Sequence, residues 1–310
     1  MKTTIFYLLV LSNVCSAQSN YIIDTSYTIK SEYNKILKQY PEVSLVQPRN
    51  HEAVNIKKEI VYKKIKDRKL HLDAYYNNNL LNPAIVIIHG GGWKSGNKSQ
   101  MEIFAIELAS KGYSCFNIEY RLSPEAKYPA AIFDAKTAIQ YIKKNARKFN
   151  TDTTKIAVLG CSSGGQMAAL IGTTNGNNNF EDNDKKVKIS SKVNAIVDID
   201  GILAFKHPES KEGPAASLWL GGSYEEIPTV WQQASPLTHT DNNTPPTLYI
   251  NSSIDRFHAG RDDMISILNK NGTYNEFQTI KNSPHSFWFL NPWFDETINY
   301  TAQFLEKVFK

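Results

Sequence analysis

The stretch "KIAVLGCSSGGQMAALIG", from Lys155 to Gly172, has the pattern of a buried strand, a turn of small residues and the opening of a helix. At its centre, Ser162 stands in the middle of a Gly-x-Ser-x-Gly pattern that begins at Gly160 and ends at Gly164. A side chain at either glycine would clash in so sharp a turn, so the glycines allow the serine to stand at its tip. Five residues of this composition also occur in ordinary packing turns. The rest of the chain must therefore supply the partners of a reactive serine.

The alternation of short β-type runs and helical runs continues over the chain from about residue 60. It predicts an α/β fold with a mostly parallel, twisted sheet and helices on both faces. Runs 59–65 and 69–76 alternate apolar and polar residues and predict an antiparallel hairpin at the N-terminal edge of the sheet. The other elements that we expect are strands at 84–90, 114–122, 155–160, 194–201, 244–252 and 275–282, and helices at 98–110, 129–146, 166–172, 260–271 and 293–309.

The N-terminus reads as an export signal. Residues 1–17 hold one lysine, a short apolar run and a small residue before the expected cleavage after Ala17. A lipoprotein signal would lipidate Cys15, but Val14 before it does not fit the small residue that such processing needs. The run is also shorter than the roughly 20 apolar residues that span a bilayer. We expect an exported protein, periplasmic or secreted, without membrane insertion.

The rest of the chain is long enough for one large domain with a substantial core. We expect an N-terminal extension over 18–57, packed on the core, and a single α/β domain over 58–310. The net charge of +5 comes from lysines interleaved with acids, without the basic block that would indicate nucleic acid. Cys115 and Cys161 belong to strands that flank a third strand, so we expect buried free thiols rather than a disulfide.

A glycine-rich loop follows the central strand and is the second anchor of the site. In "HGGGW", which begins at His89, the glycines leave the backbone free to turn its amides toward a developing oxyanion. The N–H groups of Gly91, Gly92 and Ser163 would form this oxyanion hole. A phosphate-binding loop is the competing interpretation, but neither a following Lys-Ser/Thr nor a Gly-x-Gly-x-x-Gly pattern is present. His89 is expected to shape the loop rather than to act as a base.

A serine hydroxyl needs an adjacent base, and the base in turn needs an orienting acid. His285 follows the strand at 275–282 and is the preferred base. Asp255 follows the strand at 244–252 and is the preferred acid, since it keeps the order nucleophile, acid, base. Among the other histidines, His51 and His71 precede the core sheet, and His207, His239 and His258 lack a strand end immediately before them. Among the other aspartates, Asp262 and Asp263 fall in the following helix, and Asp198 and Asp200 lie on an earlier strand.

With these residues in place, "HGGGW", "EYRLSPEAKYPAAIFDAKTAIQYI" and "GCSSGG" resemble the α/β-hydrolase superfamily over roughly 58–310. They are most similar to its bacterial carbohydrate esterases, the acetyl-xylan, pectin-acetyl and feruloyl esterases. The "YRLSPE" segment is also similar to the hormone-sensitive-lipase branch, whereas "INSSIDRFHAGRDDM…PHSFW…PWF" favours the carbohydrate esterases. By this resemblance Asp255 and His285 match the acid and base of the triad. No long helical lid of the lipase kind is legible in 18–57, which argues against a pocket for a long acyl chain.

Side chains next to the site residues are candidates for substrate binding. Trp93 and Trp288 adjoin the glycine loop and the histidine, and flat aromatic faces suit sugar rings, although such residues also build cores. Arg256 and His258 could contact an acidic sugar, or could serve the surface or cap a helix. Scattered histidines without His-x-x-x-His or paired cysteines argue against a metal site.

The resemblance implies a serine esterase that deacetylates plant cell-wall polysaccharides or oligosaccharides, such as acetylated xylan or pectin. It needs no cofactor and implies no obligate protein partner. Feruloyl esterase or general short-chain carboxylesterase activity is the alternative, and an exopeptidase is more distant. A non-catalytic carbohydrate-binding protein on the same fold is the contrasting class, because fold alone does not decide function.

Overall fold

The structure, a computed structural model, describes residues 24–78, 81–182 and 189–310, so the expected signal peptide at 1–17 lies outside the described residues. The strands are β1 Ser44–Leu45, β2 Val54–Ile65, β3 Arg68–Asn77, β4 Asn82–Ile88, β5 Ser114–Ile118, β6 Thr151–Cys161, β7 Ala195–Ile199, β8 Thr247–Asn251, β9 Asn275–Thr279 and β10 Leu290–Asn291. The helices are α1 Ile29–Ile36, α2 Glu102–Ser110, α3 Ala130–Lys144, α4 Ser163–Thr173, α5 Pro214–Leu220, α6 Pro228–Gln233, α7 Arg261–Lys270 and α8 Phe294–Val308.

Eight strands form the main sheet in the order β2-β3-β5-β4-β6-β7-β8-β9, and β1 pairs with β10 apart from it. β2 and β3 make an antiparallel hairpin at one edge, β3 is antiparallel to β5, and the pairs from β5 to β9 are parallel. The predicted fold class, a mostly parallel sheet with an antiparallel N-terminal edge hairpin, is confirmed. The chain therefore brings the carboxyl ends of its parallel strands to one edge, where such sheets bind ligands.

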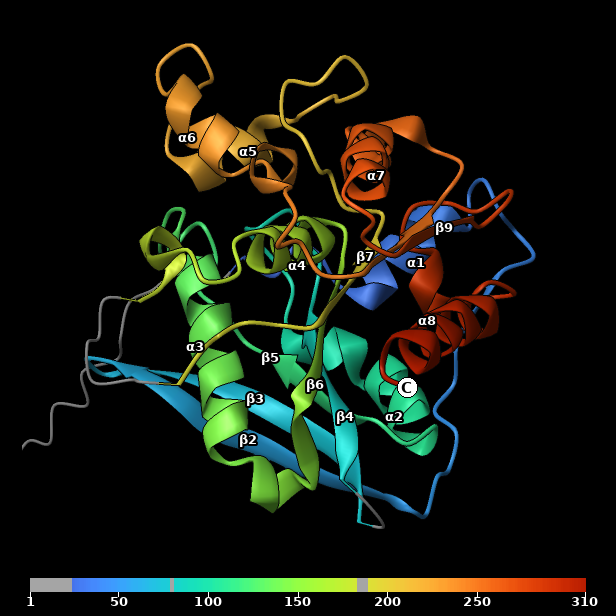
Figure 1. Cartoon of the computed structure of the whole chain (residues 1–310). Coiled ribbons are helices and arrows are strands. Elements are labelled where there is room, and N and C mark those ends of the chain that lie inside the picture. The colour runs from blue at the N-terminus through green and yellow to red at the C-terminus, as the bar shows by residue number, and fades with distance from the viewer. Residues whose placement is uncertain (1–23, 79–80, 183–188) are drawn as a thin grey trace, which may run out of the picture.

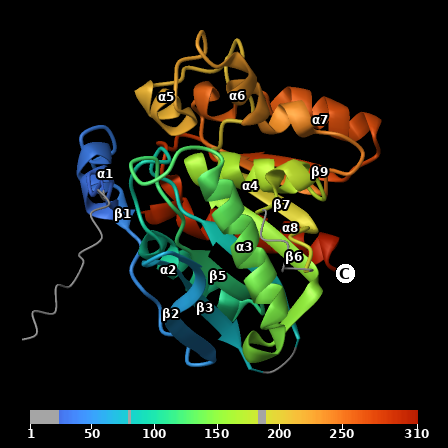
Figure 2. The same ribbon diagram turned by 90° about the vertical axis from the view of Figure 1, so that its left-hand side faces the viewer.

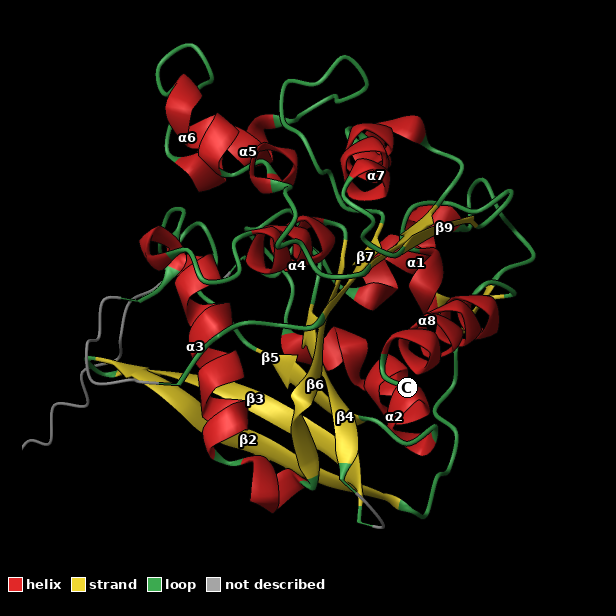
Figure 3. Ribbon diagram, viewed as in Figure 1, coloured by secondary structure: helices red, strands yellow, loops and turns green. Residues whose placement is uncertain are grey.

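The sheet is buried on both faces, as Figures 1 and 3 show by the helices on either side of the strands. In β4 the side chains alternate between two cores: Val86 and Ile88 belong to one, and Ile85 and Ile87 to the other. The first core includes residues of α3, α4 and α7, and the second includes residues of α1, α2 and α8. A continuous β-branched run thus became the centre of the sheet, because both of its faces are covered.

Two features beyond the sheet differ from the expectation. Helices α5 and α6 lie between β7 and β8 and were not predicted; Figure 2 shows them with α7 at one end of the molecule. The strand expected at 114–122 ends at Ile118, and the residues after it make contacts outside the sheet. Tyr120 donates its hydroxyl to the His89 carbonyl, and Arg121 pairs with Asp134.

The structure also bears on the two cysteines and on membrane-spanning helices. Cys115 and Cys161 are buried and free, as expected. Of the helices that the structure describes, none has both the length and the apolar character needed to cross a bilayer.

Candidate active site

Ser162 occupies a strained turn between β6 and α4. Its φ of 56° and ψ of −123° are outside the regions that non-glycine residues prefer, and its N–H donates to the Ile199 carbonyl at 2.7 Å. A Cβ at Gly160 would come within 1.9 Å of the Gly164 carbonyl oxygen, and one at Gly164 within 2.2 Å of the Ile88 oxygen. Both glycines are therefore required for this turn, as the pattern predicts.

The base lies within hydrogen-bond reach of this serine. His285 Nε2 is 2.9 Å from Ser162 Oγ, and His285 Nδ1 is 2.8 Å from Asp200 Oδ2. The carboxylate can only accept, so Nδ1–H donates to it and leaves Nε2 free to accept the serine proton. The side chain of Asp200 is fully buried, and its Oδ1 accepts the N–H of Ser252 at 2.7 Å. The arrangement suits a serine that must lose its proton before it attacks a carbonyl.

The prediction that Asp255 orients His285 is therefore wrong. Asp255 lies in a short 3-10 helix, Asp255–His258, with 90% of its side chain exposed, and its carboxylate lies 3.7 Å from the imidazole of His258 rather than against His285. Asp200, which the sequence analysis disfavoured because it lies on an earlier strand, takes the place instead. The order along the chain is still nucleophile, acid, base.

Asp200 could have been found from its own signal. It comes directly after the buried strand β7 and before Gly201, so it lies at the same edge of the sheet as the turn after β6. Its φ is 53°, and the backbone turns there as the chain leaves the sheet. A rule that admits any strand-end aspartate, rather than one particular strand, would have kept both carboxylates as candidates.

Two aromatic rings hold the imidazole of His285. Phe257 stacks on it with ring centroids 3.5 Å apart and an interplanar angle of 9°, while Trp288 meets it edge-on at 5.2 Å. Trp288 is only 1% exposed and lines neither pocket at Ser162. Its assignment to substrate binding is corrected, because it is part of the core behind the histidine. Phe257 lies on the solvent side and was not predicted.

The glycine loop lies against the serine. Gly91 and Gly92 line the space around Ser162 with φ of 131° and 61°. In the part of the chain that the structure describes, no hydrogen bond is formed by either amide N–H. Ser163 is the first residue of α4, and the N–H groups of a helix's first turn have no acceptor within the helix. Gly91, Gly92 and Ser163 thus border the pockets at Ser162 with backbone N–H groups that donate to no acceptor among the described residues, and their role as an oxyanion hole stays a prediction.

His89 shapes this loop from beneath. It is buried, stacks on Tyr120 and lies with Nδ1 2.8 Å from the Gly90 carbonyl oxygen. Burial lowers the pKa of His89 to about 4, so it is neutral at physiological pH. This agrees with the expected structural role.

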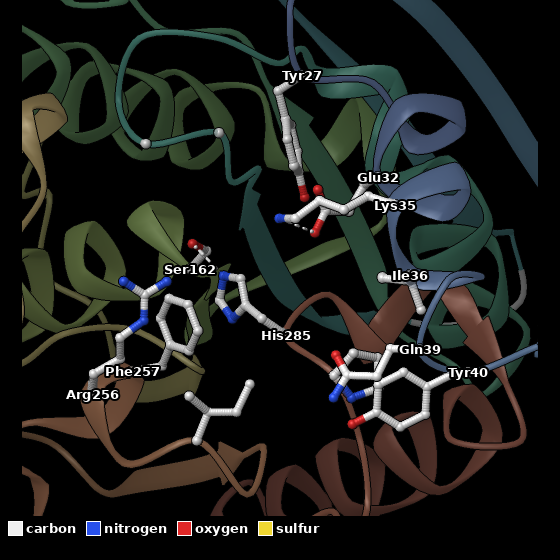
Figure 4. Close-up of a pocket in the computed structure, with 14 residues that line it drawn as sticks. Tyr27, Glu32, Lys35, Ile36, Gln39, Tyr40, Ser162, Arg256, Phe257 and His285 are labelled. Atoms are coloured by element: carbon white, nitrogen blue, oxygen red, sulfur yellow. Dashed lines mark hydrogen bonds and ion pairs between the residues drawn. The ribbon is translucent and has the colours of Figure 1, made fainter.

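Two pockets meet at Ser162. The larger, about 480 Å³, is lined on one side by Ser162, His285, Arg256 and Phe257 and on the other by residues of the N-terminal segment. Figure 4 shows the two groups facing each other across the space. The smaller, about 230 Å³, is bordered mainly by apolar or small residues, with Lys211 and Glu212 at one part of the wall. Its lining includes Trp93, Ile202, Ala215 and Ala216.

The other predicted contact residues have separate outcomes. Arg256 lines both pockets. Trp93 borders the smaller pocket but is 6% exposed, donates Nε1–H to Gln166 and stacks on Trp219 at 4.9 Å. It is thus a wall held by the core rather than an open sugar platform. His258 lines neither pocket, and its assignment to substrate binding is corrected, because it is turned toward Asp255.

The contribution of the N-terminal segment to the pocket was not predicted. Nothing in the sequence of this segment places it beside residues some 250 positions away. The residues of this segment that line the larger pocket are Tyr27, Glu32, Lys35, Ile36, Gln39 and Tyr40. Within the described ranges, no group of three or more His, Cys, Asp or Glu side chains is arranged to hold a metal ion.

Curated proteins are similar to part of this chain in sequence. "Esterase LipC" of Mycobacterium tuberculosis is 32% identical over 180 residues, which cover 56% of this chain and 44% of that protein. The "Probable carboxylic ester hydrolase LipM" of the same organism is 26% identical over 227 residues, 70% of this chain and 51% of that protein. The chain thus spans about half the length of these curated relatives.

Solved structures agree on the fold. A "Bifunctional GH43-CE" protein of Bacteroides eggerthii superposes with a TM-score of 0.69 and 25% identity, covering 84% of this chain and 36% of that one. A truncated carbohydrate esterase from gut microbiota gives a TM-score of 0.68 at 24% identity, covering 85% of this chain and 99% of that one. At this identity the second likeness shows the α/β-hydrolase fold alone.

The family model described as BD-FAE matches residues 71–259, more than half of the chain, and includes the glycine loop, the serine turn and Asp200. On this match, the chain belongs to the BD-FAE family and has the α/β-hydrolase fold.

Proposed function

We propose that this protein is an exported serine esterase that removes acetyl groups from plant cell-wall polysaccharides or their oligosaccharides. The observation that carries the proposal is the continuous contact from Ser162 Oγ to His285 Nε2, at 2.9 Å, and from His285 Nδ1 to Asp200, at 2.8 Å. These contacts lie beside three backbone donors and at the junction of two pockets. The names of the relatives, an esterase and a carboxylic ester hydrolase, support the same reaction class. The signal-peptide pattern at 1–17 supports export.

In the first half-reaction, His285 Nε2 takes the proton of Ser162 while Oγ attacks the ester carbonyl carbon. The amides of Gly91, Gly92 and Ser163 then hold the oxyanion. Collapse of the tetrahedral intermediate breaks the bond to the alcohol oxygen, and His285 gives its proton to that oxygen. In the second half-reaction, water attacks the acyl-enzyme with His285 as base, which releases the acid and restores Ser162. Asp200 stabilises the imidazolium in both halves.

The pocket that holds the alcohol and the pocket that holds the acyl group can be told apart by which of them His285 lines. The departing alcohol oxygen must lie near His285 Nε2, because that nitrogen protonates it. His285 lines the larger pocket and does not line the smaller one. The alcohol side of the ester therefore occupies the larger pocket, and the acyl group occupies the smaller one, against Trp93 and Ala215.

The positive charge of Arg256 at the larger pocket favours a sugar that carries a carboxylate as the alcohol. The guanidinium of Arg256 is exposed between the two pockets and lies 4.3 Å from the centre of the Phe257 ring. In the described part of the chain it forms no ion pair. A uronate carboxylate in the larger pocket could accept from it, which favours acetylated pectin over acetylated xylan.

A feruloyl esterase is the second candidate. The acyl-side pocket of about 230 Å³ has more room than an acetyl group needs, since a water molecule's share of the liquid is about 30 Å³. Its apolar lining also suits an aromatic acid.

The test is acetate release from acetylated xylan and acetylated pectin by the wild type, Ser162→Ala and the exposed control Ser253→Ala. Methyl ferulate and 4-nitrophenyl acetate run beside them. Acetate release from one polymer by the wild type and Ser253→Ala, but not by Ser162→Ala, supports the proposal and identifies the polymer. Release of ferulate without release of acetate supports the feruloyl esterase instead. Failure of a fluorophosphonate probe to label Ser162 in folded protein would favour a non-catalytic binding protein.

A further inference from the structure

One wall of the larger pocket comes from a part of the chain that the family match does not cover. The match begins at His71, whereas Tyr27, Glu32, Lys35, Gln39 and Tyr40 come from α1 and its flanks. Figure 4 shows them across the pocket from Arg256 and Phe257, with Ser162 and His285 between the two walls. The space beside His285 is therefore closed by a segment that lies outside the family match.

We propose that this N-terminal segment forms the recognition wall of the alcohol subsite and selects hydroxyl-rich leaving groups, such as sugars, over fatty alcohols. The inference rests on the proposed esterase reaction, since it uses the assignment of the larger pocket to the departing alcohol. Beyond the proposed function, it names the residues that bind the alcohol.

The polar side chains of this wall indicate which class of alcohol it binds. Glu32 supplies a carboxylate, Lys35 an ammonium group and Gln39 an amide, so acceptors and donors stand side by side. Glu32 and Lys35 are 3.5 Å apart on the helix, and Lys35 is 76% exposed. Sugar hydroxyls both donate and accept hydrogen bonds, so neighbouring donor and acceptor side chains can bind them. A fatty alcohol would instead displace water from these polar groups without replacing the hydrogen bonds that the water made, which costs free energy.

The wall is fixed to the loops that hold the candidate catalytic groups. The Ser95 hydroxyl accepts the Tyr27 N–H at 2.9 Å and donates to the Asp24 carbonyl at 2.9 Å, and the Ser95 N–H donates to the Gly91 carbonyl. The Tyr27 hydroxyl lies 3.1 Å from that of Ser286, the residue after His285. One end of the segment is thereby tied to the glycine loop and the histidine loop together.

The other end is tied down as well. β1 pairs with β10 through Ser44 and Leu45, and the ring of Tyr40 meets that of Trp293 edge-on at 5.8 Å. Figure 2 shows α1 and β1 together at the flank of the molecule. The wall is therefore preorganised, so substrate binding does not have to order it first.

The double variant Glu32→Ala/Lys35→Ala tests the proposal, because it removes one charge of each sign and leaves the net charge unchanged. Lys38→Ala/Glu42→Ala is the matched control: it changes the same charges in the same segment, and neither residue lines the pocket. The substrates are an acetyl series and one butyrate. The acetyl esters differ in the alcohol: acetylated xylo-oligosaccharide, acetylated oligogalacturonate, glycerol monoacetate, hexyl acetate and 4-nitrophenyl acetate. The butyrate, 4-nitrophenyl butyrate, differs in the acyl group.

We expect kcat/KM for the acetylated sugars to fall about tenfold in Glu32→Ala/Lys35→Ala, the effect of losing two ordinary hydrogen bonds. The 4-nitrophenyl esters should keep their rates and their acetyl-to-butyrate ratio, as should every substrate with the control. Deacylation should be unchanged, because the alcohol has left by then. A parallel fall for all esters, or a changed acyl preference, would overturn the proposal.

Failure of the proposed function is distinguishable. A wild type that hydrolyses 4-nitrophenyl acetate but no acetylated sugar would overturn the polysaccharide assignment. The readout for the wall is then the preference for glycerol monoacetate over hexyl acetate, because only the first of these releases a hydroxyl-rich alcohol. Loss of that preference in Glu32→Ala/Lys35→Ala supports the wall, and an unchanged preference overturns it.

Discussion

Asp200 Oδ2 lies 2.8 Å from His285 Nδ1, and the other carboxylate oxygen of Asp200 accepts the N–H of Ser252 at 2.7 Å. Because both oxygens are engaged and the side chain is fully buried, the carboxylate has one available orientation toward the imidazole. Asp198, two residues earlier and within β7, is different: burial and the charge of Asp200 raise its pKa well above the ordinary value. The end of β7 thus holds one carboxyl group that favours its neutral form, and the turn after it holds the carboxylate that faces the histidine.

Asp200→Asn should lower kcat by about 10⁴-fold, as loss of the orienting carboxylate does in other serine hydrolases. An amide nitrogen facing Nδ1 would favour the tautomer that carries its proton on Nε2, and that nitrogen could no longer accept from Ser162. The measurement is kcat with 4-nitrophenyl acetate, with circular dichroism to show that the variant is folded.

Asp255→Asn is the matched control, because it makes the same chemical change at the carboxylate that the sequence analysis preferred. Its side chain is 90% exposed, so we expect kcat/KM within about twofold of the wild type. A loss at Asp255 as large as that at Asp200 would mean that the loop after β8 carries the acid during turnover.

The sequence predicted what depends on local pattern. The order of strands and helices, the serine turn and the glycine loop all follow from residues that are neighbours in the chain. The choice between Asp200 and Asp255 depends on which of two adjacent strand ends approaches a histidine that follows a third strand. Trp93 and Trp288 adjoin site residues in sequence, but packing against Trp219 and behind His285 places them in the core. The wall built by α1 depends on contacts between the N-terminal segment and the opposite end of the chain, which no local pattern contains.

Phe257→Leu should lower kcat about two- to fivefold, since a cation over an aromatic face gains about 0.5–1 kcal/mol at exposed sites. The imidazolium that forms during acyl transfer lies flat on the Phe257 ring, at 3.5 Å, and leucine has no π face to offer it. KM for 4-nitrophenyl acetate should change less than kcat. Phe277→Leu is the control: Phe277 also carries an arginine over its ring, at 5.1 Å, but it does not touch His285. Equal effects of both substitutions would exclude a role for the stack.

Arg256→Gln should lower kcat/KM for acetylated oligogalacturonate about tenfold or more, because a hydrogen bond to a charged group contributes about 1.5–3 kcal/mol. Acetylated xylo-oligosaccharide without uronate should be affected much less. The wild-type preference for the acidic substrate should also weaken as salt is added, since the guanidinium is exposed. Arg147→Gln, an exposed arginine that lines neither pocket, controls for net charge. Equal losses on both sugars would assign Arg256 to the structure of the loop.

Gly160→Ala should destabilise the protein by about 3 kcal/mol or more, the upper range for overpacking, because the new Cβ would lie 1.9 Å from the Gly164 carbonyl oxygen. Backbone on both sides of the turn would have to move, so Ser162 would leave its position against His285 and activity should fall with stability. Thermal unfolding followed by circular dichroism measures the first effect, and we expect Tm to fall by about 6 °C or more. Gly213→Ala is the stability control, because a Cβ at Gly213 would have no atom within 4 Å and its backbone is extended. A Gly160→Ala protein with unchanged Tm and full esterase activity would show that the turn can open without cost, contrary to the strain inferred at Ser162.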